Sequence, residues 1–123
     1  YEFSCPWTLT KIRAGITYDL DHILPLAVYP INELWNLVPA DPDFNSHKKR
    51  DRLPSIASLT NAEDSLNATY STYSASRTLG PVLREDVALR FGAKPVTDFS
   101  MSIVHSVKNF IQQIGEARNL AQF

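Results

Sequence analysis

Two titratable side chains stand next to each other inside an apolar stretch of the sequence. Asp21 and His22 lie between Leu20 and Ile23, where charged groups are costly unless they are paired or hold a metal ion. Adjacent strand residues point to opposite faces, so a regular strand cannot direct both side chains to one ion. The pair therefore suits a division of work, with one side chain at a metal ion and the other handling a proton. An imidazole titrates near neutral pH and can take a proton from water.

Two short strands joined by a loop are predicted around this pair. Residues 18–24 are rich in Tyr, Leu and Ile and stop at a proline, and residues 34–38 form a second apolar run that a proline closes. Residues 26–33 between them contain proline and asparagine, which are typical of a connecting loop. Ahead of the pair, residues 1–17 indicate short extended segments with a turn near Gly15.

Helix signals dominate the rest of the sequence. Asp41 suits an N-cap and Pro42 the first helical position, which predicts a helix that runs to about Arg50. Thr60 and Glu63 match a capping box at the start of another helix. The further helices are predicted over residues 61–75, over residues 81–91, and from Thr97 or Asp98 onward, where apolar residues recur at helical spacing.

A strand hairpin packed on a helix would bring three polar positions to one end of this unit. These positions are the pair Asp21 and His22, Asn36 on the second strand, and Asn45 in the helix. Carboxylate and amide oxygens are hard ligands suited to Mg²⁺ or Mn²⁺. Each residue also has an ordinary explanation when it is taken alone. The pair could be a local ion pair, Asn36 could close a turn, and Asn45 could be a solvated helix residue.

The stretch over residues 18–55 resembles the HNH, or ββα-metal, nuclease family. The spacing is most similar to the HNH domain of RNA-guided CRISPR effector nucleases, in which an Asp-His pair also precedes a central Asn by fourteen residues and a helical Asn follows nine residues later. The resemblance is carried by the runs Asp21-His22-Ile23-Leu24-Pro25, Leu34-Trp35-Asn36-Leu37-Val38-Pro39, Asn45-Ser46-His47-Lys48 and Leu53-Pro54-Ser55.

This resemblance implies a role for each member of the constellation. His22 would be the general base that activates water, and Asn36 would orient the base or its loop. Asp21 and Asn45 would hold one divalent cation, Mg²⁺ or Mn²⁺, against the scissile phosphate, and Asp43 would be an additional or alternative ligand. The expected reaction is phosphodiester hydrolysis that leaves a 5′-phosphate and a 3′-hydroxyl.

A basic run follows the predicted ligands and is the candidate nucleic-acid contact. It could touch DNA phosphates, as the resemblance suggests for Lys48, or it could be a solvated helix end that complements the helix dipole. His47 points to a different side of the helix from Asn45 and is a weaker ligand candidate. The formal charge of −1 predicts weak, salt-sensitive DNA binding by the isolated domain. The run consists of Lys48, Lys49, Arg50 and Arg52.

Cysteine use separates this chain from many HNH nucleases, which place zinc-binding cysteine pairs around the motif. Cys5 is the single cysteine, so neither an internal disulfide nor a structural zinc site is expected, and Phe3, Trp7 and the helical tail are expected to give support instead. No apolar run has the length of a membrane span, and a cytoplasmic location is the default expectation. The chain opens on Tyr1 and not on Met, which suggests a piece of a larger polypeptide whose other domains would be partners.

The sequence as a whole predicts an α+β fold: a ββα-metal core over residues 1–59 and a helical C-terminal extension over residues 60–123, packed as one compact domain. The expected function is a metal-dependent endonuclease acting on DNA, in a larger prokaryotic antiviral defence or restriction protein by family association. Two alternatives stay open. One is a nuclease for RNA or structured nucleic acid, and the other is an inactive HNH-like module that only binds.

Overall fold

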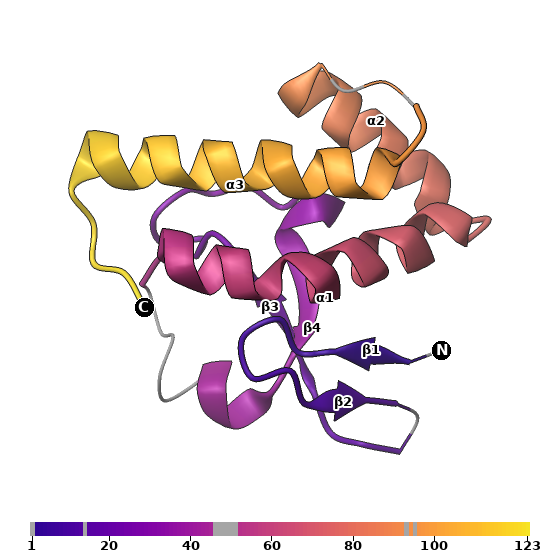
Figure 1. The fold of residues 1–123 in the computed structure, drawn as a ribbon, viewed down its shortest axis with the longest axis horizontal. Coiled ribbons are helices and arrows are strands. Elements are labelled where there is room, and N and C mark those ends of the chain that lie inside the picture. The colour runs from indigo at the N-terminus through magenta and orange to yellow at the C-terminus, as the bar shows by residue number, and fades with distance from the viewer. Residues whose placement is uncertain (1, 14, 46–51, 93, 95) are drawn as a thin grey trace.

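Two small hairpins and three long helices make up the computed structural model (Figure 1), which describes residues 2–13, 15–45, 52–92, 94 and 96–123. This arrangement confirms the predicted α+β class with a helical C-terminal part. The elements are, in chain order, β1 (Phe3–Ser4), β2 (Lys11–Ile12), β3 (Asp19–His22), the 3-10 helix η1 (Leu34–Asn36), β4 (Leu37–Ala40), α1 (Ile56–Ala75), α2 (Leu79–Phe91) and α3 (Phe99–Arg118).

The β3–β4 hairpin carries the Asp-His pair. Its strands are antiparallel, and Asp19 pairs with Ala40 and His22 with Leu37 at the two ends of the register. The second strand differs from the prediction, because η1 occupies its first three positions and β4 continues through Pro39. A proline is tolerated there because β4 belongs to a two-stranded sheet, where its missing N–H can face away from the partner strand.

The start of η1 is fixed by a residue far along the chain. The backbone N–H of Leu34 donates to the carboxylate of Asp86 on α2 at 2.9 Å. Beside it, Glu33 accepts hydrogen bonds from the guanidinium of Arg90 on α2, with an Nε–Oε1 distance of 3.1 Å. These bonds hold the pKa of Glu33 below its ordinary value. Because the contacts come from α2, the local sequence alone gives no signal for the 3-10 turn.

Only the start of the helix after β4 lies in the described part of the chain. Residues 42–45 are helical, and the carboxylate of Asp41 accepts from the N–H of Asp43 at 3.0 Å. This bond confirms Asp41 as the N-cap. The predicted end of the helix near Arg50 lies outside the described residues.

The first long helix begins earlier than the capping box predicted. α1 starts at Ile56, after Ser55, whose hydroxyl accepts from the N–H of Ser58 at 3.1 Å. Thr60 therefore lies inside the helix, and α1 runs through residue 59, where the sequence suggested a boundary. The ends of the later helices agree better with prediction: α2 ends before Gly92 at φ 67°, and Asp98 precedes α3 without a capping bond from its side chain.

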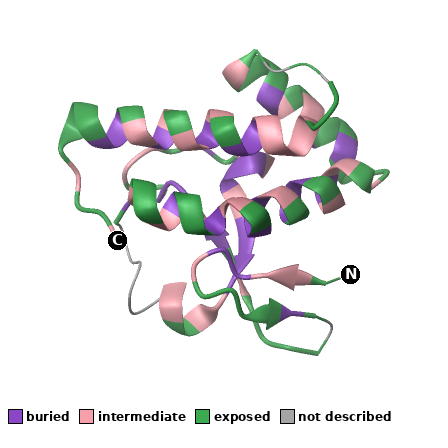
Figure 2. Ribbon diagram, in the orientation of Figure 1, coloured by how far each residue is buried: buried purple, intermediate pink, exposed green. Residues whose placement is uncertain are grey.

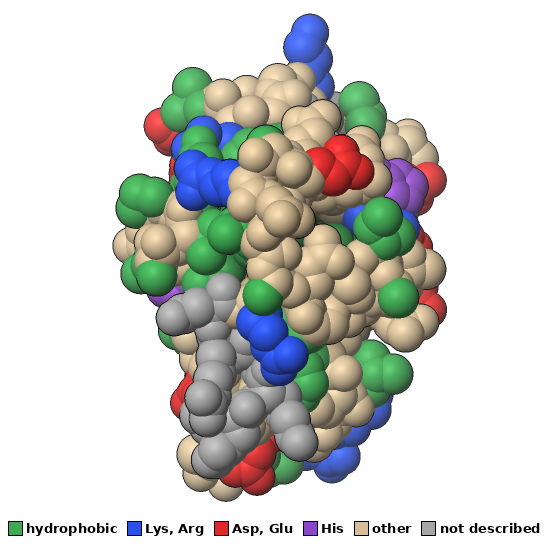
Figure 3. Space-filling model, turned by 90° about the vertical axis from the view of Figure 1, so that its left-hand side faces the viewer, with side chains coloured by type: hydrophobic (Ala, Val, Ile, Leu, Met, Phe, Trp, Pro, Cys, Tyr) green, Lys and Arg blue, Asp and Glu red, His purple; other side chains and the backbone are tan. Residues whose placement is uncertain are grey.

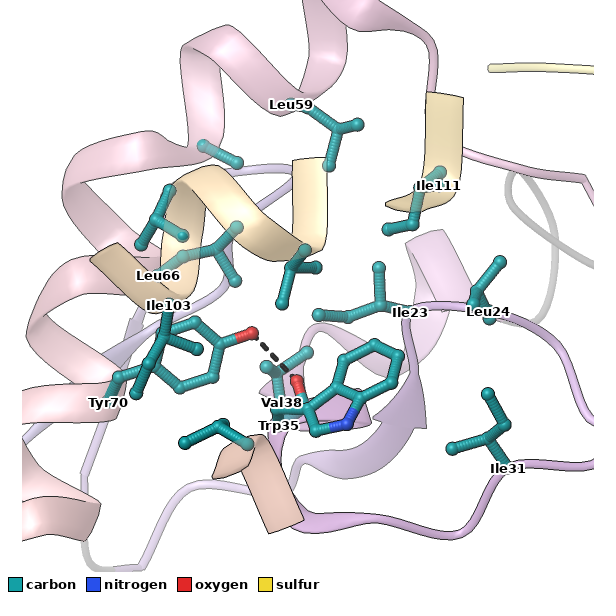
Figure 4. Close-up of a cluster of buried hydrophobic side chains, with 14 of the residues drawn as sticks. Ile23, Leu24, Ile31, Trp35, Val38, Leu59, Leu66, Tyr70, Ile103 and Ile111 are labelled. Atoms are coloured by element: carbon teal, nitrogen blue, oxygen red, sulfur yellow. Dashed lines mark hydrogen bonds between the residues drawn. The ribbon is translucent and has the colours of Figure 1, made fainter. Parts of the chain in front are cut away.

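The core lies where α1 meets α3 on one side and the β3–β4 hairpin on the other. Figure 2 shows buried residues on β3 and β4 and along the facing sides of the helices. Trp35 is fully buried, and its carbonyl accepts from the hydroxyl of Tyr70 at 2.7 Å (Figure 4). One turn further along α1, Tyr73 donates to the carbonyl of Leu37 at 2.7 Å. Burial raises the pKa of both phenols, which therefore stay protonated as donors.

The C-terminal segment after α3 returns to the residues that precede α1. The N–H of Leu53 donates to the carbonyl of Ala121 at 2.9 Å, the N–H of Phe123 donates to the carbonyl of Leu53 at 2.8 Å, and the N–H of Ser55 donates to the carbonyl of Phe123 at 2.9 Å. This pairing ties the two ends of the helical part together. Among the described residues, no helix has the length and apolar character required to cross a membrane.

Candidate active site

Asp21 lies on a buried face of β3 and is oriented by an indole. Its side chain is only 4% exposed, and its Oδ2 accepts from Nε1 of Trp7 at 3.1 Å. Trp7 belongs to the loop between β1 and β2, so the first hairpin reaches across to the second at this point. The sequence suggested a supporting role for Trp7, but nothing local indicated that it would donate to the proposed metal ligand.

Asn45 meets the same face of β3. Its Nδ2 donates to Oδ2 of Asp19 at 3.0 Å. Asp19 and Asp21 are two positions apart on the strand, so they share a face and are separated by about 7 Å. The Asn45 amide therefore meets β3 at its first residue, on the face that also carries Asp21. Asp19 was not among the predicted site residues, although its spacing of two from Asp21 was the available signal.

His22 is the last residue of β3, at the edge of the loop that follows. Its Nε2 lies 3.2 Å from Oδ1 of Asn32, and the chain bends at Ile23 and Leu24. The regular pairing of β3 with β4 turns His22 to the face opposite Asp21. The structure thus brings Asp21 and Asn45 to one face through Asp19, and it places His22 at the strand end beside the loop.

Asn36 is fully buried and holds that loop from inside. Its Oδ1 accepts from the N–H of Leu24 at 2.8 Å, and its Nδ2 donates to the carbonyls of Leu24 and Ile31, both at 3.1 Å. The backbone adds a bond from the N–H of Ile23 to the carbonyl of Asn36 at 2.9 Å. Asn36 therefore fixes the bend that directly follows His22.

The remaining predicted residues lie further from this face or outside the described chain. Asp43 is exposed, and residues two positions apart on a helix do not face each other, so Asp43 does not share the side of Asn45. Arg52 is exposed and lines a cavity of about 470 Å³ beside Trp7. On the molecular face in Figure 3, described Lys and Arg side chains are scattered and do not form one patch. His47, Lys48, Lys49 and Arg50 lie outside the described residues.

The donor set on the Asp21 face fits a hard divalent cation. It offers the carboxylate of Asp21 and the amide oxygen of Asn45, and oxygen ligands are those that Mg²⁺ and Mn²⁺ prefer. Among the described residues, no three His, Cys, Asp and Glu side chains form a group that could hold a metal ion. The cation would thus depend on Asn45 and on water or phosphate oxygens, which Mg²⁺ commonly retains.

Comparison with known proteins points to the same region. Residues 5–55 match the family model of the HNH endonucleases. This region begins after β1 and ends just before α1, so it contains β2, the β3–β4 hairpin and every predicted site residue. The match covers less than half of the chain and supports an HNH nuclease with a nucleic-acid substrate; the family generally uses a divalent metal. Neither the curated proteins nor the solved structures contain a match to the chain.

Proposed function

We propose that this chain is a metal-dependent endonuclease that hydrolyses phosphodiester bonds in DNA with one Mg²⁺ or Mn²⁺ ion. The observation that carries the proposal is the contact between Asn45 and Asp19, which places the amide on the Asp21 face within the region that matches HNH endonucleases. In a ββα-metal site, these two oxygen donors from separate elements would hold the ion together.

Asp21 and Asn45 would hold the cation. When bound, the cation would neutralise charge on the phosphate and stabilise the leaving oxygen. The indole of Trp7 restrains the Asp21 carboxylate through the 3.1 Å hydrogen bond. Restraint of this kind lowers the conformational entropy lost when a ligand residue binds a metal, and such supporting contacts commonly tune metal affinity.

His22 would take the proton from the attacking water. Its Nε2 lies 3.2 Å from the amide oxygen of Asn32, to which it would donate in the tautomer that is protonated at Nε2. In that tautomer Nδ1 would be the nitrogen that acts as the base. Asn36 contributes indirectly, because its three hydrogen bonds fix the bend after His22 and thereby limit the positions that the ring can take.

The substrate and setting follow from the family resemblance and the charge of the chain. The spacing similar to CRISPR effector nucleases suggests the nuclease module of a larger prokaryotic defence or restriction protein, located in the cytoplasm. Lys48, Lys49, Arg50 and Arg52 would contact phosphates, and Asp43 would be a secondary ligand. With a formal charge of −1, the chain should bind DNA weakly without its other domains, and binding should fall as salt rises.

A plasmid cleavage assay tests this function. The wild-type protein with Mg²⁺ or Mn²⁺ should nick or linearise the plasmid, and EDTA should abolish the activity. The variant His22→Ala should be about 10²–10⁴-fold slower, the usual contribution of a general base. His105→Ala is the matched control, because His105 is exposed on α3, and it should cleave like the wild type.

Each other result of this assay has a defined meaning. Cleavage that persists in both His22→Ala and EDTA would show that the assigned site is wrong. Cleavage of RNA but not of DNA would move the substrate to the RNA alternative. Absence of cleavage of either nucleic acid would favour the inactive HNH-like module that only binds.

A further inference from the structure

We propose that Asp19 is a positioning residue that turns the amide oxygen of Asn45 toward the cation. The inference rests on the proposed metal-dependent function and assigns a role to a carboxylate outside the predicted ligand set. Its basis is the 3.0 Å contact between Oδ2 of Asp19 and Nδ2 of Asn45.

The fold explains why these two residues meet. Asp19 is the first residue of β3 and pairs with Ala40, the last residue of β4. Asp41 follows directly and caps the helix, so Asn45 lies one helical turn after the end of the strand. The start of β3 and the first turn of the helix are therefore neighbours, and a short side chain at position 19 can reach the amide.

The chemistry of the contact decides which way the amide points. A carboxylate can only accept hydrogen bonds when ionised, so the Asn45 atom that faces Asp19 must be the NH₂ group. The amide oxygen, two bonds away, then points away from Asp19. Without this partner the amide could rotate and present the NH₂ group, which cannot ligate a cation. Asp19 thus selects the ligating orientation of Asn45.

If the hydrogen bond between Asp19 and Asn45 only stabilised the packing of the helix on the strand, a different result would be expected. Its loss would then lower the stability of the metal-free protein and leave the cation affinity of the folded protein unchanged. Loss of a positioning contact lowers the affinity itself, typically by about 10–100-fold when a partner of a metal ligand is removed.

The test measures Mn²⁺ affinity of the whole chain by electron paramagnetic resonance of free Mn²⁺, together with the melting temperature in EDTA. The variants are Asp19→Ala, which removes the acceptor, and Asp19→Glu, which keeps a carboxylate that can only accept when ionised. Asp64→Ala is the matched control, because Asp64 is an exposed acid on α1. Asp19→Ser is a second disrupting variant for the case that Asp19→Ala fails to fold, since a hydroxyl both donates and accepts and does not select one amide orientation.

We expect Asp19→Ala and Asp19→Ser to bind Mn²⁺ about 10–100-fold more weakly than the wild type. Asp19→Glu should keep most of the affinity, and Asp64→Ala should match the wild type. Wild-type affinity in both disrupting variants would overturn the inference and leave the proposed function intact. Equal losses in Asp19→Glu and Asp19→Ala would also overturn it, because an acceptor-only carboxylate at position 19 would then not be what sets the affinity. No Mn²⁺ binding by the wild type would overturn the metal-dependent function as well.

Discussion

Replacing Asn36 with alanine should destabilise the whole chain. The side chain is fully buried, and the substitution removes its three hydrogen bonds to Leu24 and Ile31. The N–H of Leu24 and the two carbonyls would lose these partners inside the fold. The loop that follows His22 would lose the contacts that hold it against β4.

The magnitude follows from these bonds. A typical buried hydrogen bond contributes about 1 kcal/mol, and a group left unsatisfied costs more. Three bonds therefore predict a loss of about 3 kcal/mol in the free energy of unfolding. For a domain of this size the corresponding fall in melting temperature is about 10 °C. A loss of this size is large compared with the usual total of about 5–15 kcal/mol.

Urea unfolding in EDTA, followed by circular dichroism at a helical wavelength, measures the effect without any metal contribution. Asn61→Ala is the matched control, because it makes the same chemical change at an exposed position on α1. The control should change the free energy of unfolding by less than about 0.5 kcal/mol. If Asn36→Ala lost no more than Asn61→Ala, the assignment of Asn36 as the residue that holds the loop would be refuted.

Two further predictions concern the helical part. Tyr70→Phe should lower the free energy of unfolding in urea by about 1–2 kcal/mol, because it leaves the buried carbonyl of Trp35 without its donor. An unchanged urea midpoint would contradict the view that α1 stabilises η1 through this hydrogen bond. The pKa of Glu33 is lowered by its hydrogen bonds from Arg90, so the pair stabilises the fold above the ordinary Glu pKa and loses this effect as pH falls through the lowered value. Glu33→Gln should therefore destabilise at pH 7 and progressively less as the pH falls below the ordinary Glu pKa, and a loss that does not change with pH would disprove the linkage.

Features set by neighbouring residues could be predicted from the sequence. Asp41 and Pro42 mark the helix start because capping is a contact within one turn. Gly92 ends α2 for a similar local reason, since its positive φ suits glycine. The strand that carries Asp21 and His22 was also predictable. The predicted range extended one residue too far at its N-terminal end and two residues too far at its C-terminal end.

Features set by distant residues could not be predicted in this way. Two capping signals compete at the start of α1, and the choice of Ser55 goes with a tertiary contact, in which the Ser58 hydroxyl donates to the carbonyl of Phe123 at 2.8 Å. The same limit applies to the site. The spacing of the predicted ligands identified the region, but the bond from Trp7 to Asp21 joins two separate hairpins, and no local pattern encodes it.

The pairing of Leu53 and Ser55 with the segment at Ala121 and Phe123 has a consequence for synthesis. A nascent polypeptide emerges from the ribosome in order, so the residues that match HNH endonucleases appear long before their C-terminal partners. The two core tyrosines on α1, Tyr70 and Tyr73, and the residues after α3 must follow before these contacts can form. We therefore expect the proposed site to form only late in translation, when nearly all of this stretch has been released.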